Sequence, residues 1–206
     1  MTIEHYSPDD TGLLLVDPYN DFLSEGGKLQ GLAAPVANAT GTLANMRSIA
    51  SAMRQHMFPI FYVPHHRARP NDFQHWRYPS PYQLGAYKAQ VFAVGSWGGQ
   101  WHPDFEPQPQ DVIVQEHWGS SGFANTDLDL QLKQHGVEKV IVIGLLANTC
   151  IESTAKFAVE LGYHVTLVRD ATAAFSEDAM RSAHDINGPT YAHAILSTEQ
   201  LLSSLL

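Results

Sequence analysis

The sequence predicts an α/β protein with a three-layer α/β/α, Rossmann-like fold, in which a parallel sheet carries helices on both faces. Short continuous apolar runs alternate from end to end with segments of helical periodicity, which is the pattern of a parallel sheet covered on both sides. The chain has 206 residues, of which 44% are hydrophobic, and shows no repeat or low-complexity tract. This length suits one domain with a full core, so we expect a single domain over residues 1–206.

The first half of the chain supplies two strands and a long helix. The run TGLLLVD, at Thr11–Asp17, is apolar up to its final acid and predicts a buried strand. Apolar side chains then recur three and four residues apart over Val36–Met57, which predicts a helix whose first turn accommodates Pro35. The run PIFYV, at Pro59–Val63, predicts the second strand.

The second half continues this alternation and ends two of its helices with glycine, the usual residue after a helix C-terminus. Strands and helices therefore alternate to the end of the chain. The expected elements are strands at Val112–Gln115, Lys139–Ile143, His164–Val168 and near Ala192–Leu196, and helices at Leu128–His135 (ended by Gly136), through Cys150 to Leu161 (ended by Gly162) and near Glu177–Ile186.

One long region, residues 64–111, interrupts the alternation and is called the insertion below. It is rich in proline, glycine and aromatic residues, and all four tryptophans of the chain lie in it or just past it. Long irregular insertions in compact α/β domains usually serve function. We expect the insertion to cover a pocket or to build a subunit interface.

Composition limits the partners and the location. The formal net charge is −9 with scattered acidic residues, which argues against a nucleic-acid partner because such proteins carry a basic face. A single cysteine cannot form an internal disulfide, and the start MTIEHYSPDD lacks the basic and apolar regions of a signal peptide. No apolar stretch is long enough to span a bilayer. We therefore expect a cytoplasmic protein that acts on a small molecule and binds neither nucleic acid nor membrane.

Chemically competent side chains follow the predicted strands. Ligands of an open α/β sheet bind outside the carboxyl ends of the strands, so these side chains are expected at one rim. A carboxylate, imidazoles and a thiol that converge there form a plausible nucleophilic site. In strand order the residues are Asp17, then His65 and His66, then Glu116 and His117, then Cys150, and last Asp170.

Each candidate also has a structural interpretation. A helix start favours the thiolate of Cys150 and its N–H groups hold an oxyanion, but a lone cysteine is often only a small buried hydrophobe. Asp17, at a strand exit, equally fits the cap of a following turn or helix. The group of His65, His66 and Asp72 has the composition of a metal site but matches no zinc spacing. We therefore favour a polar rim or a solvated loop for these three residues and expect no metal.

Three stretches together resemble one family. They read LLLVDPYNDF, SGFANTDL and GLLANTCIESTAKFAVELGYHVTLVRDATAAFS, and in this order they resemble the isochorismatase-like cysteine hydrolases, which include nicotinamidases and N-carbamoylsarcosine amidases. The resemblance covers nearly the whole chain outside the insertion. It implies an Asp–Lys–Cys triad, in which Asp17 and Cys150 fall on the Asp and the Cys. It also implies a cis peptide at Leu145–Leu146 and an oxyanion hole formed by the N–H groups of Leu146 and Cys150.

The lysine of that triad is where the sequence departs from the family. The family lysine precedes the Phe of the SGF motif by six residues, and His117 stands six residues before Phe123 here. An imidazole can take a thiol proton and form a thiolate–imidazolium pair. We therefore expect His117 in the lysine role. The alternatives are a base from elsewhere, an incomplete triad, or a histidine that packs under Trp118 or only shapes the pocket.

The resemblance implies hydrolysis of a C–N bond in a small amide, carbamoyl or ureido compound, through a thioester on Cys150. Asp17 would receive the thiol proton or orient the base, and His117 would support the deprotonation. Aromatic walls are usual for small-molecule sites, and Trp97, Trp118 and Phe123 are the candidates. This chemistry needs no cofactor. The family tends to form oligomers, so we expect a homo-oligomer.

Three other functions compete with this one. A true isochorismatase cleaves a vinyl ether with the Asp and needs no Cys, so Cys150 argues against that reaction. The missing lysine would suit a catalytically impaired, hydrolase-like binding protein. A redox sensor at Cys150 would need an intermolecular partner, because the chain has no second cysteine.

Overall fold

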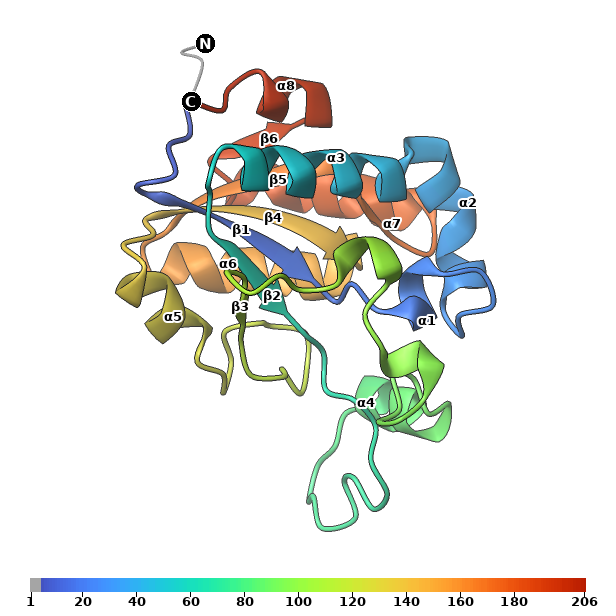
Figure 1. Cartoon of the computed structure of the whole chain (residues 1–206). Coiled ribbons are helices and arrows are strands. Elements are labelled where there is room, and N and C mark those ends of the chain that lie inside the picture. Colours follow the sequence, from blue (N-terminus) through green and yellow to red (C-terminus); the bar gives the residue numbers. More distant parts are fainter. Residues whose placement is uncertain (1–4) are drawn as a thin grey trace.

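A computed structural model describes residues 5–206 and shows a six-stranded parallel sheet in the order β3-β2-β1-β4-β5-β6 (Figure 1). Helices lie on both faces, so the predicted three-layer α/β/α fold is confirmed. The strands are β1 (Thr11–Val16), β2 (Ile60–Val63), β3 (Val112–Ile113), β4 (Lys139–Leu145), β5 (His164–Ala173) and β6 (Ala194–Leu196).

Figure 1 shows α2, α3, α7 and α8 on one face of the sheet and α5 and α6 on the other, while α1 and α4 lie beyond its carboxyl edge. Within residues 5–206, no helix is long and apolar enough to cross a membrane. The helices are α1 (Asn20–Leu23), α2 (Gln30–Thr40), α3 (Thr42–Gln55), α4 (Pro81–Lys88), α5 (Leu128–Gln134), α6 (Glu152–Glu160), α7 (Glu177–Arg181) and α8 (Thr198–Leu202).

The core fixes β1 from every side. Successive side chains of a strand point to opposite faces of the sheet. Leu13 and Leu15 pack in one core cluster with α3, while Leu14 and Val16 pack in a second cluster with α5 and α6. Both edges of β1 pair with neighbouring strands, β2 and β4, and all of its residues are buried. The position of the next residue, Asp17, is therefore set by the most enclosed strand of the fold.

The long helix predicted over Val36–Met57 is wrong in its bounds. Two helices, α2 and α3, replace it, and Gly41 separates them with a left-handed φ of 68°. α2 begins at Gln30, so Pro35 lies inside this helix rather than in its first turn. Glycine adopts the left-handed conformation at least cost, which allows the break. The apolar spacing continues across the break because both helices pack against the same core cluster.

The other predicted elements are present with shifted bounds. β3 and β6 are shorter than predicted, whereas β4 and β5 run further toward the carboxyl edge. Cys150 lies in a π-helical turn, Ala147–Ile151, that precedes α6, and a second π-helical turn, Ser182–Asn187, follows α7. Gly136 and Gly162 adopt the left-handed conformation after α5 and α6, as predicted. The sequence did not predict the short helices α1, α4 and α8.

The insertion is partly helical and is tied to the segment after β1. It contains α4 and two short 3₁₀ turns. The Asp21 carboxylate accepts hydrogen bonds from the backbone N–H groups of Lys28, at 3.0 Å, and of Phe92, at 2.7 Å. Asn20 Nδ2 donates to the Trp97 carbonyl at 3.0 Å. The chain that leaves β1 therefore both carries Asp17 and anchors the insertion at the same rim.

Candidate active site

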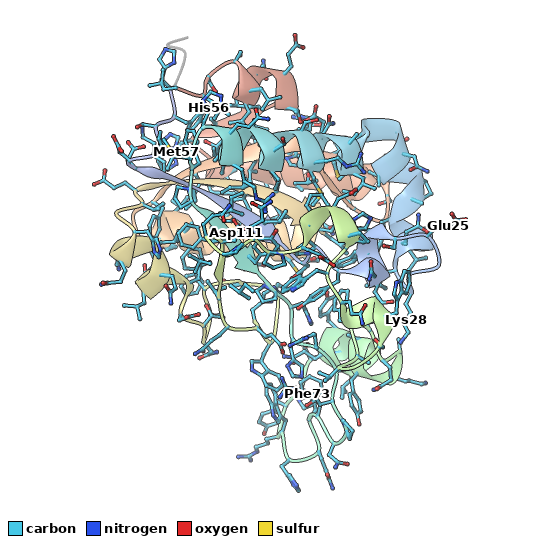
Figure 2. All side chains as sticks on the ribbon, viewed as in Figure 1. Glu25, Lys28, His56, Met57, Phe73 and Asp111 are labelled. Atoms are coloured by element: carbon cyan, nitrogen blue, oxygen red, sulfur yellow. The ribbon has the colours of Figure 1, made fainter. Side chains whose placement is uncertain are left out.

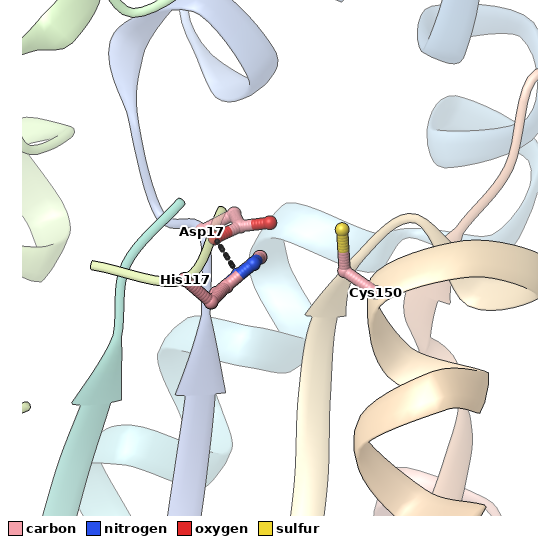
Figure 3. Close-up of side chains that lie close together, drawn as sticks. All are labelled: Asp17, His117 and Cys150. Carbon is pink, nitrogen blue, oxygen red and sulfur yellow. Dashed lines mark hydrogen bonds and ion pairs between the residues drawn. The ribbon is translucent and has the colours of Figure 1, made fainter. Parts of the chain in front are cut away.

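Asp17, His117 and Cys150 converge at the carboxyl edge of the sheet, after β1, β3 and β4 respectively (Figure 3). His117 Nε2 lies 3.1 Å from Asp17 Oδ1, and one polar atom from each of the three residues lies within 4.8 Å of the other two. All three side chains are fully buried, at 0% exposure. Asp17 and His117 thus enclose the thiol at the end of the sheet. The fold therefore joins a carboxylate, an imidazole and a thiol from three separate strands.

Asp17 adopts an unusual backbone conformation. Its φ of 53° lies in the left-handed region, which residues other than glycine seldom occupy, although Asp and Asn tolerate it best. Its N–H donates to the Val63 carbonyl of β2 at 3.1 Å. α1 begins without a side-chain cap, so Asp17 does not serve as the cap that the sequence left open. Strain of this kind at a buried polar residue is typical of functional sites.

Each ring nitrogen of His117 faces a hydrogen-bond acceptor. Nδ1 lies 2.7 Å from the Gly119 carbonyl, while Nε2 faces Asp17. A carbonyl only accepts, so Nδ1 carries a proton, and a second proton lies between Nε2 and the carboxylate. Burial alone lowers the pKa of His117, but the charge of Asp17 and the hydrogen bond to it outweigh burial and raise the pKa. An imidazolium beside a carboxylate provides the same charge pair as a lysine beside a carboxylate.

The surroundings of Cys150 favour the protonated thiol over the thiolate. Burial, followed by the negative charge of Asp17, raises the pKa of the thiol well above its ordinary value. The expectation that the helix start would favour a thiolate is therefore wrong for this state. Desolvation of a fully buried thiol outweighs the partial positive charge of a helix terminus, which here begins with an irregular π-helical turn. A nucleophilic role for this thiol would need a nearby base, and a carboxylate oxygen of Asp17 lies within 4.8 Å of it.

Tyr82 reaches the thiol from the insertion, and the sequence analysis missed it. Its hydroxyl lies within hydrogen-bonding reach of Cys150. Burial, then the charges of Cys150 and Asp17, raise the pKa of Tyr82, which keeps the hydroxyl protonated. Tyr82 lies in the first turn of α4, whose start is fixed by a capping box between Ser80 and Gln83. The spacing of Ser80 and Gln83 was the sequence signal for an ordered helix inside the insertion.

A cavity of about 260 Å³ lies beside the triad. α4 and the residues that follow it form most of the wall, and Leu146 and Phe175 complete it. Leu146 begins the turn that carries Cys150, and its peptide bond to Leu145 is cis, as the resemblance implied. The side chains of His65 and Tyr82 supply the polar atoms of an otherwise apolar lining. The insertion therefore covers a pocket, which is one of the two roles predicted for it.

The three predicted wall residues lie outside this lining. Trp97 is 49% exposed on a 3₁₀ turn. The ring of Trp118 stacks on that of His66, with the ring centroids 3.7 Å apart, and Trp118 lines a small neighbouring cavity. The prediction that Phe123 forms a pocket wall is wrong. This side chain is 5% exposed and belongs to a core cluster, where its ring stacks on that of Phe157 with the ring centroids 5.9 Å apart. Its apolar surface is already covered by core packing.

The histidines after β2 have separate partners. His66 contacts two carboxylates, with Nε2 2.7 Å from Asp72 and Nδ1 3.3 Å from Glu116. His65 Nδ1 lies 2.9 Å from the His66 carbonyl and therefore carries the ring proton, which leaves Nε2 as an acceptor. Burial, then the charge of His117, lower the pKa of His65 to about 4, so its ring is neutral at pH 7. The two histidines therefore differ, because both ring nitrogens of His66 face carboxylates whereas His65 keeps Nε2 as an acceptor.

Asp170 lies inside β5, because this strand is longer than predicted, and it accepts hydrogen bonds from the N–H and hydroxyl of Thr198, at 2.8 Å each. Asp170 therefore anchors α8 and does not join the site.

Among the described residues, the donor set of Asp17, His117 and Cys150 is the one whose atoms lie close enough for a metal ion, and such ligands suit zinc.

Comparison with known proteins identifies the family. Residues 11–199 match the model of the Isochorismatase domain. The chain belongs to the isochorismatase family. A curated relative, ureidoacrylate amidohydrolase RutB from Rhizobium rhizogenes, is 27% identical over 186 residues, which cover 85% of this chain and 75% of that protein. RutB from Variovorax paradoxus is 27% identical over 205 residues, which cover 95% of this chain and 81% of that protein. The prediction of an isochorismatase-like hydrolase is confirmed.

Solved structures share the fold of this isochorismatase-family protein. A cysteine hydrolase from Pseudomonas syringae pv. phaseolicola superposes with a TM-score of 0.79 at 22% identity, covering 99% of this chain and 98% of that one. N-carbamoylsarcosine amidase from Thermoplasma acidophilum gives a TM-score of 0.67 at 25% identity, covering 92% of this chain and 97% of that one. The likeness extends over nearly the full length of each chain.

Proposed function

We propose that this isochorismatase-family hydrolase cleaves a C–N bond in a small amide, carbamoyl or ureido compound, with Cys150 as the nucleophile. The observation that carries the proposal is the buried cluster of the Cys150 thiol with the Asp17–His117 pair, whose polar atoms lie within 4.8 Å of one another. The names of the relatives support the type of bond, because ureidoacrylate amidohydrolase and N-carbamoylsarcosine amidase both act on C–N bonds.

In the proposed reaction, the thiol proton passes to Asp17 while Sγ of Cys150 bonds to the substrate carbonyl carbon. A protonated resting thiol makes proton transfer part of the attack rather than a step before it. His117 holds the carboxylate in place and offsets its charge. The C–N bond then breaks, the nitrogen takes the proton from Asp17, and ammonia or an amine leaves. Water attacks the remaining thioester and releases the acid, while one proton of the water passes through Asp17 to Sγ and restores the thiol.

The negative charge that develops on the substrate oxygen needs donors. We assign the backbone N–H groups of Leu146 and Cys150 to this oxyanion hole, in agreement with the resemblance. In comparable enzymes the loss of one such donor costs about 3 to 4 kcal/mol of transition-state stabilisation. The Tyr82 hydroxyl, which stays protonated, is a third donor at the thiol.

A substrate panel tests the proposal. Released ammonia is measured with primary amides, N-carbamoyl amino acids and alkylureas, for the wild type and for Cys150→Ser. We expect turnover by the wild type, a loss of about 10³-fold or more in the variant, and a hydroxamate when hydroxylamine intercepts the thioester. Thermal unfolding of both proteins controls for folding.

Other outcomes separate the rival functions. Turnover of a vinyl ether that survives Cys150→Ser would indicate the isochorismatase reaction. Ligand binding without any turnover would indicate the impaired binding protein. The cytoplasmic location, the homo-oligomer and the single domain over residues 1–206 stay predictions.

A further inference from the structure

The cavity beside the triad has a composition that selects among substrates. We infer that the site takes an uncharged amide or ureide with an apolar body, and that it excludes substrates carrying a carboxylate on that body. The inference rests on the proposed function and specifies its substrate class.

The cavity offers no cation to an anionic substrate. Within the described part of the chain, its lining contains no lysine or arginine, and its polar side chains are His65 and Tyr82. The His65 ring is neutral at pH 7, and the Tyr82 hydroxyl is engaged at the Cys150 thiol. Beyond the lining, the His117 imidazolium is already paired with the Asp17 carboxylate at 3.1 Å, so this pair offers no free positive charge to a substrate carboxylate.

The cations next to the lining residues in sequence are not part of the lining. Lys28, next to the lining residue Leu29, donates its ammonium group to the Gln90 carbonyl, and Figure 2 shows it on the outer side of the molecule. Arg67, two residues after His65, lies 2.6 Å from Glu116. Lys88 is exposed on α4. A substrate carboxylate in the cavity would therefore lose its hydration without gaining a partner, which strongly opposes binding.

His65 provides a complementary atom for the substrate nitrogen. Its Nε2 is buried and accepts no hydrogen bond from the described residues. Nε2 is an acceptor, because Nδ1 holds the ring proton against the His66 carbonyl. An amide or ureido N–H satisfies this atom, whereas a carboxylate, which only accepts, cannot. Hydrogen bonding and charge thus point to the same class of substrate.

Two isosteric pairs test the charge preference. In 3-methylbutylurea an isopropyl group replaces the carboxylate of 3-ureidopropionate, and in 5-methylhexanamide it replaces that of glutaramate. We expect kcat/KM to be at least about 100-fold higher for the uncharged member of each pair, as for an unpaired buried charge. Equal values, or a preference for the carboxylates, would overturn the inference.

Binding to Cys150→Ser, measured by calorimetry with the same four compounds, separates this inference from the proposed function. If the wild type hydrolyses none of them but the variant binds only the uncharged members, the proposed reaction fails and the substrate class stands. If the variant binds the carboxylates as tightly as their partners, or binds none of the four, the substrate class fails regardless of turnover.

A third comparison tests His65. The ketone 6-methylheptan-2-one has the shape of 5-methylhexanamide but lacks its N–H groups. On Cys150→Ser we expect the amide to bind about tenfold more tightly, the range of one buried hydrogen bond. The preference should vanish with His65→Leu and persist with His65→Gln, which retains an acceptor. A preference unchanged by His65→Leu would remove His65 from recognition, and thermal unfolding controls for misfolded variants.

Discussion

The carboxyl edge of the sheet and the insertion meet at one site but are built differently. Asp17, His117 and Cys150 follow strands and are fully enclosed. In contrast, α4 contributes no buried residue, although α4 and the residues that follow it form most of the cavity wall, and Figure 2 shows Phe73 of the insertion far from the sheet. The comparison teaches that the core fixes the reacting groups, while a helix without buried residues contributes to the space for the substrate.

The largest expected effect falls on the sheet edge. Asp17→Asn removes the base that receives the thiol proton, so we expect kcat to fall by about 10³-fold or more, with a folded protein retained. Steady-state ammonia release measures the change. Asp170→Asn is the matched control, because this carboxylate anchors α8 and does not join the site. Equal losses in both variants would mean that the fold, rather than the chemistry, responds to these acids.

The next largest effect concerns stability and the close approach of two strand backbones, at Gly144 of β4 and Val16 of β1. Gly144 has a φ of 121°, and a Cβ there would lie 2.1 Å from the Val16 carbonyl oxygen of the neighbouring strand. We expect Gly144→Ala to destabilise the protein by about 3 kcal/mol or more in urea unfolding. Gly31→Ala, in α2 with open space around it, should be neutral or slightly stabilising. A tolerated Gly144→Ala would show that the sheet edge adapts more easily than its packing suggests.

Two histidines with ring centroids 5.0 Å apart should respond to pH in opposite directions. His65 takes up a proton near pH 6.5 when unfolded but only near 4 when folded, so stability is lost as the pH falls through this window, by about 3 kcal/mol. His117 has a raised pKa, so its contribution is present below about pH 6.5 and is lost as the pH rises through the folded value. Unfolding free energies of the wild type, His65→Gln and His117→Gln against pH measure both slopes. Slopes unchanged by these variants would contradict the assignment.

The smallest effect concerns the insertion itself. Tyr82→Phe removes the hydroxyl near Cys150 but keeps the aromatic wall, so we expect kcat/KM to fall about five- to tenfold with unchanged stability. Tyr78→Phe, at a tyrosine that is 81% exposed in the same insertion, is the control and should have no effect. A loss as large as that of Asp17→Asn would place the insertion inside the chemistry and break the contrast between the two regions.

Local signals in the sequence determined the parallel sheet, most of its strands and the positions of Asp17, His117 and Cys150 at strand ends. Apolar runs and the rule that strand ends share one rim depend only on residue type and spacing. The role of Asp170 and the packing of Phe123 were not predictable in this way, because each depends on a neighbour distant in sequence. The split at Gly41 was hidden because the apolar spacing continues across it.

Only the tertiary structure decided the protonation and the cavity. The raised pKa of the Cys150 thiol follows from its enclosure beside Asp17. These two residues follow different strands, β4 and β1, which pair side by side in the sheet. Likewise, Tyr82 belongs to the site because the insertion folds back onto the rim, held by Asp21. Sequence patterns report which face of an element is apolar, but burial and charge proximity arise from the assembled chain, and these set the chemistry of the thiol.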